Sequence, residues 1–131
     1  MAISHTWTKS VKVPGLATLP SDGAIVITGD YATDIEVTVA AGATVEVDVG
    51  TISVDKVQSL ILHSDQVSVT VNTNDVAGTT GQTIDLGAAK SFGWNNTDNF
   101  ANPIVADIAK FFVTNAGSKS TVFRAGFLLN A

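Results

Sequence analysis

Apolar and polar residues alternate with a period of two along most of this 131-residue chain. Residues 34–39 place an isoleucine and two valines on one parity and Asp34, Glu36 and Thr38 on the other. Residues 44–49 repeat the pattern with three valines. Because successive side chains of a strand point to opposite faces, each segment predicts a β-strand with one dry face and one wet face. The short link at residues 40–43 contains Gly42, so we predict that the two strands form an antiparallel pair.

Similar segments recur at short intervals, and residues 57–63 have the composition of a more fully buried strand. Residues 108–114 and 121–129 predict a final hairpin through the turn at residues 115–119. Residues 103–112 allow one helical turn at most, since their apolar spacing also fits a turn followed by a strand. The other strands are predicted at residues 3–13, 24–28, 67–71, 84–86 and 90–94. About nine or ten short strands predict an all-β fold, a two-sheet antiparallel β-sandwich of the jelly-roll or immunoglobulin type.

Composition narrows the possible classes of protein. With 45% hydrophobic and 15% charged residues the chain is expected to fold, as one domain over residues 14–131. Seven Lys and Arg against twelve Asp and Glu give a net charge of −5, so nucleic acid is not an expected partner. No apolar run approaches the roughly 20 residues that span a bilayer, and the start lacks a secretory pattern, so we expect synthesis in a cytoplasm and no membrane. The absence of cysteine excludes disulfides, thiolate zinc sites and a cysteine nucleophile.

No catalytic, cofactor or metal site is predicted. The two histidines, His5 and His63, are distant in sequence. Ser64 and Asp65 follow His63, but adjacent strand residues point to opposite faces, so adjacency does not build a triad. Residues 72–78 resemble a calcium loop only superficially, because a valine occupies a ligand position and no glutamate closes the set.

Residues 92–102 are the segment richest in aromatic and amide side chains. Flat rings beside amides suit sugar recognition, since rings cover apolar sugar faces and amides bond hydroxyl groups. Alternatively, Trp94 and Phe100 are core anchors on either side of an asparagine-rich turn. We include both residues among the candidate interface positions.

The N-terminal residues 1–13 are expected to form an arm or an edge strand used at an interface. One parity contains Ile3, His5, Trp7, Lys9 and Val11, so the segment is amphipathic but interrupted by polar residues. His5, Trp7, Lys9 and Val11 are therefore further candidate interface residues. Proline at positions 14 and 20 would separate the segment from the next strand, because proline has no amide hydrogen to donate. An equally valid interpretation makes this segment the first strand of the sandwich.

Four segments together resemble the small β-sandwich head proteins of tailed bacteriophages, which include capsid decoration or cement proteins. They are VQSLILHSDQVSVTV, IDLGAAKSFGW, NPIVADI and FVTNAGSKSTVFRAGFLL. The resemblance implies a non-enzymatic virion protein that binds the major capsid protein. We also expect a homo-oligomer, a trimer, because engaging several subunits of a symmetric lattice adds avidity. A tail or baseplate component and a carbohydrate-binding module remain alternatives.

Overall fold

The computed structural model describes residues 3–7, 25–77, 79–87 and 91–131. Within these ranges the chain forms ten strands and a three-residue 3₁₀ helix, η1 (Val54–Lys56). No helix of the described residues is long and apolar enough to cross a membrane. The strands are β1 (Ile3–Trp7), β2 (Ile25–Gly29), β3 (Tyr31–Val39), β4 (Thr44–Ile52), β5 (Val57–Ser64), β6 (Val69–Thr73), β7 (Thr83–Asp85), β8 (Ser91–Asn95), β9 (Ile108–Asn115) and β10 (Thr121–Leu129). The prediction of an all-β protein of about ten strands is confirmed.

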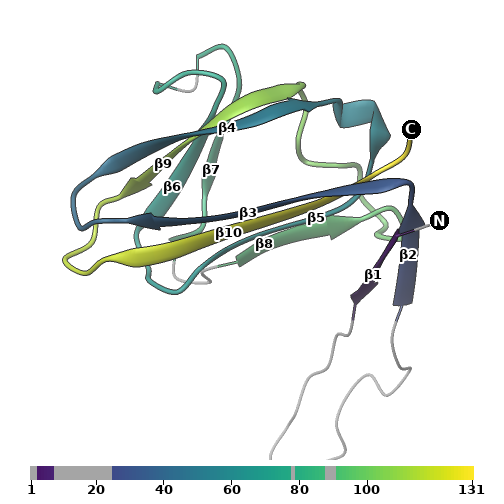
Figure 1. Cartoon of the computed structure of the whole chain (residues 1–131), viewed down its shortest axis with the longest axis horizontal. Helices are drawn as coiled ribbons and strands as arrows, with labels where there is room; N and C mark the ends of the chain where they lie inside the picture. The colour runs from purple at the N-terminus through teal and green to yellow at the C-terminus, as the bar shows by residue number, and fades with distance from the viewer. Residues whose placement is uncertain (1–2, 8–24, 78, 88–90) are drawn as a thin grey trace, which may run out of the picture.

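Two four-stranded antiparallel sheets pack face to face, in the orders β3-β10-β5-β8 and β4-β9-β6-β7 (Figure 1). The pairs β3–β10, β4–β9, β5–β8 and β6–β7 are those of one long hairpin whose arms are β3 to β6 and β7 to β10. Rolling that hairpin adds the contacts β5–β10 and β6–β9. An eight-stranded roll of this kind is a jelly roll, so of the two predicted sandwich types the strand order selects this one.

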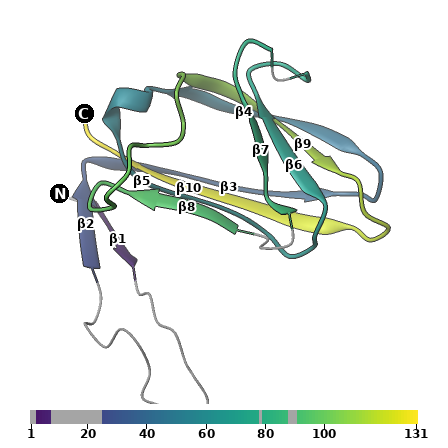
Figure 2. The ribbon, with the colours of Figure 1, turned by 180° about the vertical axis from the view of Figure 1, so that it is seen from behind.

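Two pairings predicted from sequence are wrong. β3 and β4 belong to different sheets, as do β9 and β10, so neither pair is a hydrogen-bonded hairpin. Each short connection instead crosses from one sheet to the other at an end of the sandwich (Figures 1 and 2). Alternation fixes which side chains face the core, but a turn of a few residues can join neighbours in one sheet or partners about 10 Å apart in two sheets.

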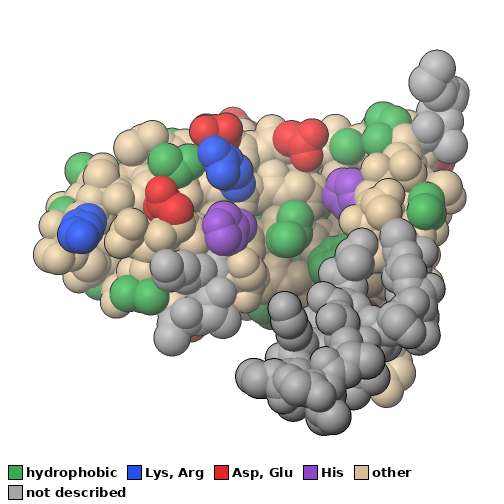
Figure 3. Space-filling model, turned by 90° about the horizontal axis from the view of Figure 1, so that it is seen from below, with side chains coloured by type: hydrophobic (Ala, Val, Ile, Leu, Met, Phe, Trp, Pro, Cys, Tyr) green, Lys and Arg blue, Asp and Glu red, His purple; other side chains and the backbone are tan. Residues whose placement is uncertain are grey.

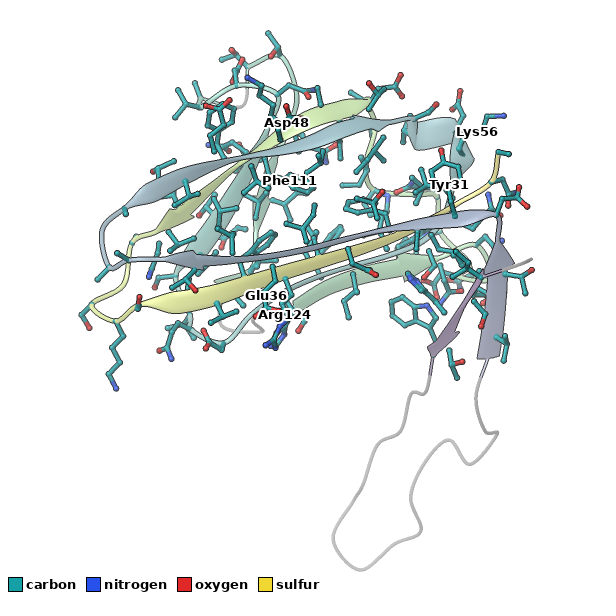
Figure 4. The ribbon with its side chains drawn as sticks, in the orientation of Figure 1. Tyr31, Glu36, Asp48, Lys56, Phe111 and Arg124 are labelled. Carbon is teal, nitrogen blue, oxygen red and sulfur yellow. The ribbon has the colours of Figure 1, made fainter. Side chains whose placement is uncertain are left out.

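The core lies between the sheets and consists of the predicted parity sets. Leu60 and Leu62 of β5 are fully buried, as are Val69 and Val71 of β6. Phe111 of β9 lies between the sheets in Figure 4 and meets two phenylalanines of β10. The remaining predicted core positions, Val37, Val39, Val45 and Val47, are buried or packed against this cluster. Val67, placed in a strand by sequence, lies before β6 and is 46% exposed, because Ser68 has a positive φ that ends the extended run.

The first two strands stand apart from the roll. β1 and β2 form their own two-stranded antiparallel ribbon at one end of the sandwich (Figure 2). The predicted N-terminal strand is therefore paired over Ile3–Trp7, and residues 8–13 lie outside the described part of the chain. The ribbon adds to neither edge of the two main sheets.

Replacing Leu60 or Leu62 by alanine is expected to lower the free energy of unfolding by about 2–5 kcal/mol, because each change leaves a cavity in a filled core. Thr38→Ala, on the exposed parity of β3, should change it by no more than about 0.5 kcal/mol. Urea denaturation followed by circular dichroism measures both. Equal costs on the two parities would contradict the register described here.

Candidate functional site

The β1–β2 ribbon lies on the outer face of the β3-β10-β5-β8 sheet. Ser59 of β5 points to that outer face, opposite in parity to Leu60, yet it is fully buried. Trp7 Nε1 donates to Ser59 Oγ at 2.8 Å, and His5 Nδ1 lies 2.9 Å from the same oxygen. Both rings come from β1, so one serine hydroxyl fixes the ribbon to the sheet.

Buried apolar residues and two glycines complete the attachment of the ribbon to the sheet. Ile27 of β2 and Leu128 of β10 are buried although Leu128 points away from the main core. A Cβ on Gly29 would lie 2.8 Å from Leu128 Cγ, and a Cβ on Gly93 would lie 2.6 Å from Trp7 Cη2. These distances are below any real carbon contact, so both glycines are required for the ribbon to approach the sheet this closely.

A groove runs along the outer face of the sheet beside β1. It consists of two adjoining depressions of about 450 and 540 Å³ that share Asp34, Ile61 and Gly126. Figure 3 shows this face with both histidine side chains on it. Ile61 is 42% exposed and supplies an apolar floor. The lining residues are Ser4, His5, Thr6, Trp7, Asp34, Ile35, Glu36, Ile61, His63, Arg124, Ala125 and Gly126.

The groove contains two carboxylates, Asp34 and Glu36, and one cation, Arg124. Arg124 and Glu36 form an ion pair of 3.5 Å, visible in Figure 4, and both side chains are more than half exposed. A pair so exposed contributes little to stability, since water screens it and both chains lose conformational freedom. Partial burial against the sheet lowers the pKa of His5 below its ordinary value, and the nearby Asp34 carboxylate partly opposes this. The neutral form of His5 therefore predominates at pH 7.

A neutral His5 also suits the bonds around Ser59. With Trp7 donating to Ser59 Oγ, the serine hydrogen can point to the bare Nδ1 of His5. Protonated His5 would instead donate from Nδ1 to Ser59 Oγ, so the bond would reverse and the serine hydrogen would lose this acceptor. A buried hydroxyl without an acceptor and a charge on a partly buried ring are both costly, so protonation disfavours docking of the ribbon.

Ser59, His5 and Asp34 superficially resemble a serine triad, but their geometry is structural. Ser59 is fully buried and its oxygen is occupied by two rings, so no substrate atom can reach it. His63 and Asp65, which flank Ser64 in the sequence, have different partners. His63 Nδ1 lies 2.8 Å from Ser91 Oγ, while Asp65 accepts a hydrogen bond from Thr121 Oγ1 at 2.8 Å. Ser64 is buried beside Thr121.

The loop after β6 is organised by the carboxylate of Asp75. Asp75 accepts bonds from the backbone and hydroxyl groups of both Thr79 and Thr80. These four donors hold the pKa of the Asp75 carboxyl far below its usual range. Asp75 therefore stabilises the conformation of this loop. Within the described ranges, no three or more His, Cys, Asp or Glu side chains lie close enough together to hold a metal ion.

The predicted interface residues do not all lie on one surface of the described structure. His5 and Trp7 lie together at the ribbon, whereas Lys9 and Val11 fall outside the described residues. The Trp94 ring is only 8% exposed and donates from Nε1 to the carbonyl oxygen of Phe100 at 2.9 Å. Trp94 therefore has the role of core anchor, the alternative considered for it.

The rest of that segment forms a turn with one exposed ring. Phe100 is 55% exposed. Asn95 Oδ1 accepts from the Thr97 amide and hydroxyl, and Asp98 accepts from the Asn95 amide. With Trp94 covered, the segment offers a sugar one exposed aromatic ring rather than two.

No protein-family model, curated protein or solved structure matches this chain.

Acidification is expected to weaken the protein through His5. In the unfolded chain His5 takes up a proton near pH 6.5, whereas the folded state resists protonation to a lower pH. Below about pH 6.5 the unfolded state therefore binds more protons, and the stability present at higher pH is lost as pH falls toward the folded pKa. Urea denaturation between about pH 8 and 5.5, above the range in which carboxylates titrate, measures this loss. His5→Gln should flatten the profile; an unchanged slope in that variant would assign the titration to another group.

Proposed function

We propose that this chain is a non-enzymatic structural protein of a bacteriophage particle, a capsid decoration protein that binds the major capsid protein. The observation that favours it is the docked ribbon on a jelly roll. Jelly rolls recur in viral capsid proteins and also in lectin domains, so the architecture alone does not select a function. The ribbon adds a separate surface whose inner side is fixed to the sheet by Ser59 while its outer side faces solvent.

The ribbon and its surroundings expose several apolar side chains. Val26 is 58% exposed on the outer side of the ribbon, and Ile3, on the same side as His5 and Trp7, is 41% exposed. The groove that β1 lines contains a third, the exposed Ile61. Exposed apolar residues grouped beside a polar rim are typical of sites that bind other proteins. On this proposal the ribbon and the groove together bind the capsid lattice.

Two alternatives remain distinct from this proposal. A tail or baseplate protein would use a similar surface on a different part of the particle, and its location on purified heads and tails separates the two. A carbohydrate-binding module would depend on Phe100, so Phe100→Ala would abolish glycan binding while leaving particle binding unchanged.

On purified particles the protein is expected at a copy number in simple ratio to the major capsid protein, measured by quantitative mass spectrometry. Val26→Asp should prevent the purified protein from binding to particles that lack it, because a carboxylate would replace an apolar contact. Val105→Asp is the matched control, since Val105 is 74% exposed in the loop before β9 and lies outside the ribbon and the groove. Particles without the protein, or equal effects of the two variants, would refute the proposal.

The free protein is expected to be a trimer, since one molecule would then engage several subunits of a symmetric lattice. Multi-angle light scattering across a range of concentrations measures the mass directly. A monomer at all concentrations would contradict self-association in solution.

A further inference from the structure

The four outer strands of the two sheets differ in how well they are protected against pairing. β7 has three residues and β8 has five, so each offers few backbone groups. β4 has nine residues, but its pairing register shifts between Asp48 and Ile52, where Gly50 has a φ of +67°. Short strands and bulges are the usual means by which proteins blunt sheet edges.

β3 has neither form of protection. It pairs with β10 without interruption over all nine residues, Tyr31–Val39, and contains no glycine, proline or lysine. Within the described part of the chain β10 is its sole strand partner. The side of β3 away from β10 faces the viewer in Figure 1, as does β4 in the other sheet. This leaves a long, regular row of backbone donors and acceptors at one side of the sandwich.

The side chains along β3 define what such an edge would accept. On the outer face Asp34 and Glu36 are exposed, and Glu36 is paired at 3.5 Å with Arg124 of β10. On the inner face Ile35 and Val37 are only half buried, and so are Val45 and Val47 of β4 on the same side of the sandwich. A strand added beside β3 would bring one set of side chains next to two carboxylates and the other set over incompletely covered valines.

We propose that the β3 edge is a docking site for an extended segment of a partner protein in which basic and apolar residues alternate. The partner's backbone continues the sheet, its basic side chains lie beside Asp34 and Glu36, and its apolar side chains cover Ile35 and Val37. In such strand addition the main chain supplies affinity and the alternating side chains supply specificity. The site goes beyond the proposed function, because the backbone edge of β3 would serve any partner with this pattern, although Asp34, Ile35 and Glu36 also line the groove.

A second copy of this chain fits the edge less well. The midpoint of β3 is Ile35, so antiparallel self-pairing along the whole strand places Asp34 of each copy opposite Glu36 of the other. Like charges directly opposite across a strand pair are destabilising. The net charge of −5 adds a general repulsion between copies.

A peptide of about the length of β3, with lysine and valine alternating and blocked ends, is the probe. Fluorescence anisotropy measures its Kd, and hydrogen exchange locates the amides it protects. We expect slower exchange along β3, and a Kd weakened about tenfold by the double variant Asp34→Lys/Glu36→Lys, because two attractive cross-strand pairs become repulsive. Glu46→Lys/Asp48→Lys is the matched control: it makes the same charge change on the bulged β4, where Glu46 also has a cationic partner, and should shift the Kd less than twofold.

Several results would overturn this proposal. They are equal weakening by the two double variants, protection of β4 or β8 instead of β3, equal binding of a peptide with glutamate in place of lysine, and protection of β3 that rises with protein concentration alone. If the β3 variant fails to fold, exchange on the unmodified protein and the glutamate peptide still decide the question. Val26→Asp, which tests particle binding, should leave peptide binding unchanged, so the two proposals can fail separately.

Discussion

The contact of Phe111 with Phe123 and Phe127 joins the two sheets at the centre of the molecule. Phe111 comes from β9 and the other two rings from β10, with centroid separations of 6.2 and 5.9 Å. All three are fully buried. β9 and β10, like β5 and β6, are inner strands that pair with two neighbours each, so the aromatic contact links an inner strand of one sheet to an inner strand of the other. The outer strands depend on this centre, because each is held by one neighbour and by the apolar face it lays on the core.

The alternation of apolar and polar residues was sufficient to predict the strands, but it did not predict which strands pair. Val37 and Val39, or Leu60 and Leu62, could be assigned to the core because parity alone decides which face a side chain joins. Parity does not say which strand lies alongside. The turns at residues 40–43 and 115–119 are short enough for a hairpin, yet both cross between sheets, since the partners of β3 and β4 come from the far end of the chain. Long-range pairing of this kind has no local signature.

The sequence predicted only part of the candidate site. His5 and Trp7 were recognised as amphipathic strand residues, but their common partner Ser59 was not, because a serine in a strand ordinarily faces water. A signal was nevertheless present in β10, where Phe127, Leu128 and Leu129 are consecutive. Three adjacent apolar residues cannot all face one side, so Leu128 required a cover on the outer face of the sheet. Ile61, apolar on the same face, carried the same information less strongly.

The two main sheets and the β1–β2 ribbon are held in place by different kinds of interaction. The roll is stabilised by a continuous apolar core that contains no ribbon residue. The ribbon is held by one shared hydroxyl, the contacts of Gly29 with Leu128 and of Gly93 with Trp7, and the burial of Ile27. The bonds to Ser59 depend on the protonation of His5, whereas the apolar core of the roll contains no titratable side chain. A proton on His5 or a side chain at Gly93 therefore acts first on the ribbon, because neither residue belongs to the apolar core of the roll.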